Sequence, residues 1–277
     1  MTELNDAFTA VQKPEPGALM AIAGSNNVEV LKALLQRGAN INEATSHGTT
    51  ALMIMVWYGH DECARFMIGR GAALDAVNEK GDTALIWAIQ SSHGELARLL
   101  IDKGADVHIK NKRGETALIT AVKKGNAPLA QRLIGKGAVV NDTDKEGNTV
   151  LMLAAAQGSE ENVRLLLDND VALNETDKYG NTALMVAAQL GNKEIVQLLI
   201  DKGADVDIKS VAGKTAQDRA MDMKHPEIAQ ILQRAAEERR RVAEEAAAEK
   251  ECARQAYIAQ KQERLKGKAR SRSVTPH

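Results

Sequence analysis

The feature that most constrains the fold is a glycine that returns at one constant interval, that between Gly48 and Gly81. A threonine follows each of these glycines by two positions, and in most copies an apolar residue and a leucine come next. A strict period of this length without insertions predicts a solenoid, in which each unit packs only against its neighbours. The glycines of the series are Gly48, Gly81, Gly114, Gly147, Gly180 and Gly213.

A second marker, Gly-Ala, recurs in the same register between these glycines, at Gly71, Gly104, Gly137 and Gly203. The register also extends towards the start of the chain, where Leu19 and Gly38 fit an earlier copy that lacks its first glycine and its threonine. The pattern therefore predicts seven repeats, from about Lys13 to about Arg234.

The sixth copy shows what each position does. Gly180 suits a turn because glycine adopts positive φ at no steric cost. Thr182 is a helix N-cap, and Leu184 begins the apolar face of a short helix that Gly191 ends. Glu194 then lies in the first turn of a second helix, where the helix dipole favours an anion. One unit is therefore a turn followed by two short helices.

This unit resembles the ankyrin repeat, which has a β-turn and two antiparallel helices in a period of about 33 residues. The family's Thr-Pro-Leu-His is here Thr-Ala-Leu-Met from Thr182 to Met185. The resemblance covers the whole repeated region and so most of the chain. It implies an all-α fold, an ankyrin-repeat solenoid of stacked helix-turn-helix units with β-turn tips, followed by a long charged helix.

Four segments are expected on this basis. Residues 1–12 form an N-terminal capping arm, with Leu4, Phe8 and Val11 on one face. Residues 13–234 form the solenoid, whose last repeat is a polar C-terminal cap. Residues 235–266 form a charged helix rich in Ala, Glu and Arg. Residues 267–277 form a disordered basic tail.

The C-terminal segment has a different charge from the body. From Pro226 onward there are twelve Lys or Arg and eight Asp or Glu, whereas the preceding residues have a net negative charge. Its heptad pattern is poor, because Arg239 and Gln260 fall at core positions. A solvated single helix is favoured over a coiled coil, a partner-bound helix or disorder. The chain is thus expected to be a monomer unless this helix self-associates.

Catalysis is not predicted. The six histidines are scattered, and His60 and His93 occupy the same repeat position, which indicates a structural role in a loop. Cys63 matches apolar core positions of other repeats, and no disulfide with Cys252 is indicated. We therefore expect no enzyme activity, no cofactor and no metal site. With no signal-peptide pattern and no apolar run of membrane-spanning length, a cytoplasmic location without membrane contact is expected.

The resemblance implies that a partner protein binds at the turn tips and along the first helix of each repeat, on the concave face. Trp57 and Tyr58 are the strongest candidates there, because these residue types dominate binding energy at interfaces. The alternative is that they only fill space in a solenoid with few large residues. Trp87, in contrast, is interpreted as core. The candidate partner-binding residues are His47, Trp57, Tyr58, Lys80, Gln90, Lys112, Arg113, Lys123, Lys124 and Tyr179.

Five of these candidates are basic and fall in adjacent repeats, so stacking is expected to gather them on one face. Such a face favours an acidic partner surface, mainly through the association rate, although it could also be an ordinary solvated surface. The function predicted first is an adaptor or inhibitor that binds a protein. The alternative is a nucleic-acid-associated protein that uses this basic patch and the basic tail.

One irregular position bears on stability. The glycine that ends the second helix in other repeats is Asp170 in the fifth. We expect Asp170 to adopt positive φ at a cost, and the fifth repeat to be locally weak.

Overall fold

The computed structural model describes residues 14–272, with side chains described as far as Lys261. Within these residues the chain forms pairs of antiparallel helices joined by loops, and no β-strand is present. The first members, here called inner helices, are α2 (Ala18–Ala23), α4 (Ala51–Tyr58), α6 (Ala84–Gln90), α8 (Ala117–Lys123), α10 (Val150–Gln157), α12 (Ala183–Leu190) and α14 (Ala216–Asp222). The second members, here called outer helices, are α3 (Val28–Gln36), α5 (Asp61–Gly69), α7 (Gly94–Asp102), α9 (Ala127–Gly135), α11 (Glu160–Leu167), α13 (Lys193–Asp201) and α15 (Pro226–Arg272).

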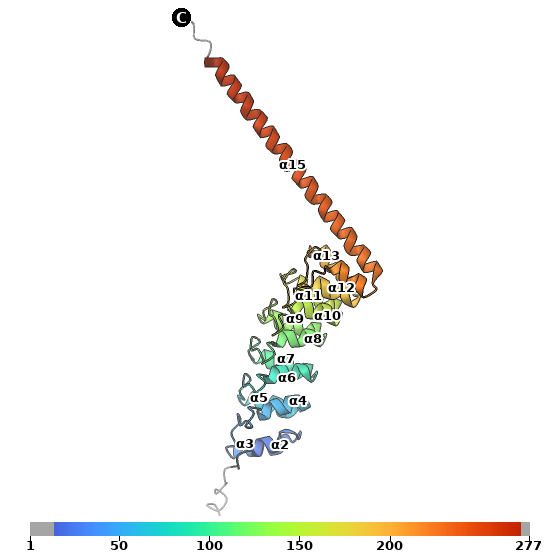
Figure 1. Ribbon diagram of the computed structural model, residues 1–277. Coiled ribbons are helices and arrows are strands. Elements are labelled where there is room, and N and C mark those ends of the chain that lie inside the picture. Colours follow the sequence, from blue (N-terminus) through green and yellow to red (C-terminus); the bar gives the residue numbers. More distant parts are fainter. Residues whose placement is uncertain (1–13, 273–277) are drawn as a thin grey trace, which may run out of the picture.

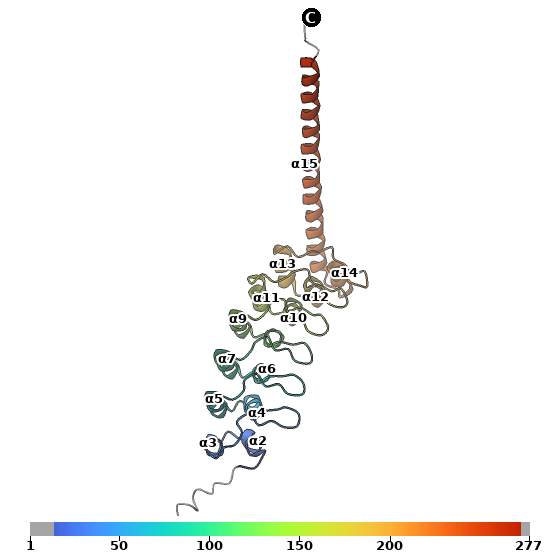
Figure 2. The same ribbon diagram turned by 90° about the vertical axis from the view of Figure 1, so that its left-hand side faces the viewer.

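The pairs stack in chain order along one axis, and α15 extends from the end of the stack (Figure 1). Turned by 90°, the molecule shows outer helices, inner helices and long loops as three parallel columns (Figure 2). Each inner helix contacts the next inner helix, and each outer helix contacts the next outer helix. The architecture is therefore the helical repeat solenoid that the period predicts.

Threonine N-caps explain where the inner helices begin. From α4 onward, the side-chain oxygen of the preceding threonine accepts a hydrogen bond from the backbone N–H three residues later, as Thr50 does from Met53 at 3.3 Å. This satisfies one of the backbone donors that a helix start leaves without an intrahelical partner. The predicted capping role of the repeated threonine is confirmed.

Small and aliphatic side chains form the core between the two helix layers. Leu85, Leu118, Leu151 and Leu184 occupy equivalent positions and are fully buried. Cys63 is also fully buried, as predicted from its match with apolar positions. Because short side chains let helices approach closely, the repeats pack without large aromatic residues in their centres.

The start of α15 belongs to the solenoid, and the rest leaves it. Ile228, Leu232 and Ala236 are buried. Arg239 makes the last described ion pair between this helix and the stack, with Asp205 at 2.7 Å. Every later residue with a described side chain is exposed. The helix has 47 residues, which corresponds to about 70 Å at about 1.5 Å per residue.

Two segment boundaries of the sequence analysis can be compared with this helix. The helix has no break at residue 235, where the solenoid is expected to give way to the charged helix. It continues to Arg272, past residue 267, where the disordered tail is expected to begin. The expected capping arm at residues 1–12 and the last tail residues, 273–277, lie outside the described residues.

Candidate protein-binding groove

The loops between repeats end in tight turns, here called the tips, which one polar side chain in each loop organises. The side-chain oxygen of Asn78 accepts hydrogen bonds from the backbone N–H groups of Lys80 and Asp82, at 2.8 and 3.0 Å. Asn111 does the same for Arg113 and Glu115, at 2.9 and 3.0 Å. Side-chain oxygens are favoured in such turns because they replace a backbone acceptor. The corresponding residues in three of the other tips are Thr45, Asp144 and Asp177. In the last tip, Oγ of Ser210 accepts one such hydrogen bond, from the N–H of Lys214 at 3.3 Å.

Neighbouring tips are tied together by backbone hydrogen bonds. The N–H of Glu79 donates to the carbonyl of His47 at 2.7 Å, and the N–H of Lys112 donates to the carbonyl of Lys80 at 2.8 Å. Gly81 lies at the contact with φ of 75°, and a Cβ there would be 3.0 Å from the Cα of Asn111. The row of tips is therefore continuous, and it holds the side chains of successive tips at a regular spacing.

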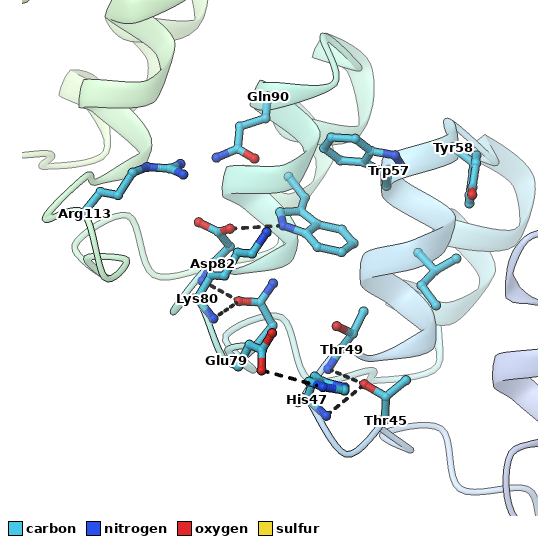
Figure 3. A pocket seen from close by; sticks show the side chains of 13 residues that line it. Thr45, His47, Thr49, Trp57, Tyr58, Glu79, Lys80, Asp82, Gln90 and Arg113 are labelled. Atoms are coloured by element: carbon cyan, nitrogen blue, oxygen red, sulfur yellow. Dashed lines mark hydrogen bonds and ion pairs between the residues drawn. The ribbon is translucent and has the colours of Figure 1, made fainter.

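A groove lies between this row and the inner helices α4 and α6, with a volume of about 680 Å³. Figure 3 shows side chains of the tips and of both helices converging on it. It brings together six of the predicted binding residues, which are His47, Trp57, Tyr58, Lys80, Gln90 and Arg113. The remaining lining residues are Thr45, Thr49, Ile54, Asn78, Glu79, Asp82 and Trp87.

Two tryptophans from adjacent repeats form the aromatic part of the groove. Trp57 is 44% exposed, and its ring packs edge-to-face against Trp87, with centroids 5.3 Å apart and an interplanar angle of 61°. Trp87 is half-buried, and its Nε1 donates to Oδ2 of Asp82 at 3.4 Å. The interpretation of Trp87 as core is therefore correct only in part, because the partly buried side chain packs against the core but also lines the groove.

Tyr58 stands at the edge of the same surface. It is 60% exposed, and its ring stacks on His60 with centroids 5.7 Å apart. His60 thus supports an aromatic side chain of the groove in addition to its position before α5.

A buried polar network beneath the groove orients Trp87. Oδ1 of Asp82 accepts a hydrogen bond from Nδ2 of Asn111 at 2.8 Å, and the same nitrogen donates to Oε2 of Glu115 at 3.1 Å. All three residues are buried. Asp82 and Glu115 are not among the predicted binding residues, although both directly follow a tip glycine, a position that is polar in every complete repeat.

Glu115 also changes the meaning of the basic patch. Its side chain is 5% exposed and accepts hydrogen bonds from Lys123 at 2.6 Å and from Arg113 at 2.8 Å. Burial raises the pKa of this carboxyl, but the hydrogen bonds from Lys123, Arg113 and Asn111 outweigh that effect and lower the pKa to about 2. Two of the five predicted cations therefore share one carboxylate within the protein, which offsets part of their positive charge.

The other three basic residues form no ion pair with any described residue. Lys80 and Lys112 line a second depression, of about 290 Å³, together with Glu79 and Arg113. Lys124 is exposed at the end of α8 and lines neither depression.

Tyr179 lies apart from the groove. It is 67% exposed at the tip of the sixth repeat, where its carbonyl accepts from the N–H of Val211 at 2.9 Å. The predicted binding residues therefore divide into those around the groove, with Lys112 beside it, and those outside it, which are Lys123, Lys124 and Tyr179.

Neither a metal centre nor a membrane-spanning helix is found in the described residues. Among the side chains described, those of residues 14–261, no group of three or more His, Cys, Asp or Glu is arranged to hold a metal ion. In the same part of the chain, none of the helices combines the length and apolar character needed to cross a bilayer.

Comparison with known proteins places the repeats in a family. A family model described as ankyrin repeats (3 copies) matches residues 19–111, 94–177 and 169–241, segments that overlap and together span nearly the whole stack. No curated protein matches the chain.

Proposed function

The chain belongs to the ankyrin-repeat family, and from this premise we propose that it is a non-catalytic module that binds a partner protein in the groove between the tips and helices α4 and α6. Ankyrin repeats are generally protein–protein interaction modules. The proposal adds where on this chain the partner binds and which side chains carry most of the binding energy.

The observation that carries the proposal is the exposure of Trp57 beside the half-buried Trp87. Half-exposed tryptophans gain the most when a partner covers them, because large apolar rings are removed from water without the cost of ordering a flexible chain. Tyr58 extends the same surface and provides a hydroxyl for a polar contact. This combination of aromatic residues is typical of a binding hot spot.

The polar groups around the groove support binding rather than chemistry. Asp82 is held by Trp87 and Asn111, and Glu79 lies 3.9 Å from His47. These carboxylates thus have partners within the protein, and they hold the tips and the ring of Trp87 in place. We accordingly propose the role of an adaptor or inhibitor, in which occupation of the groove is itself the function.

The test is the double variant Trp57→Ala/Tyr58→Ala. Partners are captured from extracts of the native host on the full chain and identified by mass spectrometry, and binding of the leading partner is then measured with purified proteins. We expect the double variant to weaken binding by at least about a hundredfold, since each hot-spot residue contributes about 2 kcal/mol or more. Its helical content should be unchanged. Its free energy of unfolding should fall by only about 0.5–1.5 kcal/mol, because the Trp57–Trp87 contact is lost.

Tyr179→Ala is the matched control, because it removes an exposed aromatic ring outside the groove. Equal loss of binding in this control, or undiminished binding in the double variant, would refute the groove as the site. A drop in melting temperature large enough to indicate lost core packing would refute the interpretation of Trp57 and Tyr58 as recognition residues.

Association with nucleic acid is the second candidate. The basic patch that favours it is weakened by Glu115, whose single negative charge offsets part of the charge of Arg113 and Lys123. Binding to phosphates falls steeply with added salt. A titration with duplex DNA and single-stranded RNA at increasing salt separates the two functions, and tight binding with a steep salt dependence would favour nucleic acid.

A further inference from the structure

We infer that the partner presents a short acidic segment with one large apolar side chain, the apolar group resting on Trp57 and Trp87 and the carboxylates meeting Lys80 and Lys112. This inference rests on the proposed function, because it specifies the chemistry of the partner for the same groove.

The floor of the groove selects an apolar group. Ile54, Trp57 and Trp87 contribute carbon surface that is only partly covered. The one polar atom of the Trp87 side chain, Nε1, already donates to Asp82. A partner side chain at this place therefore gains by removing apolar surface from water, and a polar side chain would lose its own hydration without a matching partner on the ring.

The neighbouring depression selects negative charge. Of its cations, Arg113 shares the buried Glu115 with Lys123, whereas Lys80 and Lys112 have no ion-pair partner in the described part of the chain. Among the described residues, Glu79 is the only carboxylate that lines the depression, and its Oε2 lies 3.9 Å from Nε2 of His47. The local balance is thus two uncompensated lysines against one glutamate, which favours an incoming carboxylate and disfavours a basic side chain.

One segment of a partner reaches both places. The groove and the second depression share Glu79, Lys80 and Arg113 in their walls and are therefore contiguous. The continuous row of tips fixes the spacing of Lys80 and Lys112, because the N–H of Lys112 donates to the carbonyl of Lys80. An apolar anchor and a nearby acidic side chain on the same short segment match this arrangement.

A basic partner segment is the competing chemistry. A lysine or arginine of the partner could lie over the open face of Trp57 by a cation–π contact and approach Glu79. Lys80 opposes this arrangement, since it lines the same groove and would repel the incoming cation. Selection of peptides on the chain decides between an acidic and a basic segment.

The two tryptophans of the chain are both in the groove, so intrinsic tryptophan emission reports on its occupation. Random dodecapeptides displayed on phage are selected on the full chain, and the enriched sequences are synthesised and titrated while the emission is followed. We expect enriched peptides to combine a large apolar residue with Asp or Glu and to shift the emission on binding. Lys80→Glu with Lys112→Glu should weaken their binding by about tenfold or more, a change of about 1.4 kcal/mol.

Lys124→Glu is the matched control, because Lys124 is an exposed, unpaired lysine outside both depressions in the described structure. It should change binding by less than about twofold. Peptides with Lys in place of Asp and Glu provide a second measurement, in which the expected result is a gain of binding. They should bind the Lys80→Glu/Lys112→Glu variant better than the native chain.

Three outcomes would overturn the inference. Enriched peptides that are basic or uncharged but still require Trp57 would overturn it while leaving the groove as the binding site. Equal weakening by Lys124→Glu would reduce the lysines to a general electrostatic effect. Peptides that bind without any dependence on Trp57 would overturn both the inference and the proposed function.

Discussion

At the tip of the fourth repeat, Glu115 is buried and accepts hydrogen bonds from Lys123, Arg113 and Asn111. In the outer helix of the fifth repeat, Asn162 is fully buried, but its side-chain oxygen accepts no hydrogen bond from the described residues. Its amide nitrogen donates to Oγ of Ser159 at 3.0 Å. The two repeats share one architecture, and one of them contains a satisfied buried polar group while the other contains a half-satisfied one.

The location of each residue within the repeat explains this difference. Glu115 lies where the tip and the inner helices supply donors from three directions. Asn162 lies at a position that is apolar and buried in the other repeats from the second onward, which have Cys63, Leu96, Leu129, Ile195 and Ile228 there. A buried polar group without its partner costs about 1–3 kcal/mol. We therefore expect Glu115 to stabilise its tip and Asn162 to weaken the core of its repeat.

The fifth repeat has a second irregularity at the end of the same helix. Asp170 adopts φ of 54°, as predicted, whereas the glycines at this position have φ of 83° to 90°. Asp168, the C-cap of α11, is 3.4 Å from Lys202, so part of its unfavourable charge at a helix C-terminus is offset. Positive φ in a residue other than glycine costs stability. We therefore expect the fifth repeat to be the least stable repeat of the central stack.

The largest effect is expected from Glu115→Ala. Removing the carboxylate deletes hydrogen bonds to two charged groups and to Asn111, and it should lower the free energy of unfolding by about 2–4 kcal/mol. Denaturant unfolding measures the change. Glu146→Ala is the control, since Glu146 is exposed at the next tip and forms no ion pair with the described residues; it should change stability by less than about 0.5 kcal/mol. Similar values for the two variants would show that the network does not stabilise the fourth repeat.

The second effect is the pH dependence of the same carboxyl. Its pKa in the folded chain is about 2, below the ordinary 4.5, so the folded state binds its proton less readily than the unfolded state. The stabilisation is complete above pH of about 4.5 and decreases as the pH falls towards about 2. Between about pH 6 and pH 3.5 the native chain should therefore lose about 1–2 kcal/mol more than Glu115→Gln does. Parallel stability curves for the two proteins across this range would contradict the assigned pKa.

The third effect tests the defect in the core. Asn162→Leu replaces the half-satisfied amide with the residue found at the equivalent position of the third and fourth repeats, and it should raise the free energy of unfolding by about 1–2 kcal/mol. Leu129→Asn is the reciprocal control, which introduces the defect into the fourth repeat and should destabilise the chain by at least as much. A destabilising Asn162→Leu would mean that the site is too narrow for the larger side chain.

The smallest effect is expected from Asp170→Gly. Relief of backbone strain and of negative charge at a helix C-terminus should exceed the added unfolded-state entropy of glycine, giving a gain of about 0.5–1.5 kcal/mol. The reciprocal change, Gly137→Asp, should cost a similar amount in the fourth repeat. The midpoints of denaturant unfolding at equal slope are the measurement. An unchanged or lowered midpoint for Asp170→Gly would show that the loop accommodates aspartate without strain.

Local features of this molecule could be predicted from the sequence. The constant repeat period, the capping threonines and the left-handed conformation of Asp170 follow from backbone rules that act over a few residues. The same rules apply at the ends of the inner helices, where Ser92 and Lys224, which the sequence analysis overlooked, adopt φ of 65° and 62° in place of the glycines of other repeats. Comparing each residue with the glycine one period away would have identified both.

The side chains around the groove were only partly predictable. A position in the repeat predicts which residues approach the tips and the inner helices, and six of ten candidates indeed line one groove. It does not predict that the ring of Trp87 packs against Trp57, or that Glu115 forms ion pairs with Arg113 and Lys123. By itself, the sequence determined the stack and the order of its parts, because the repeat register and helix caps are local. Only the tertiary structure decided which charges and which aromatic surfaces remain open to a partner, because that depends on contacts between residues of different elements and different repeats.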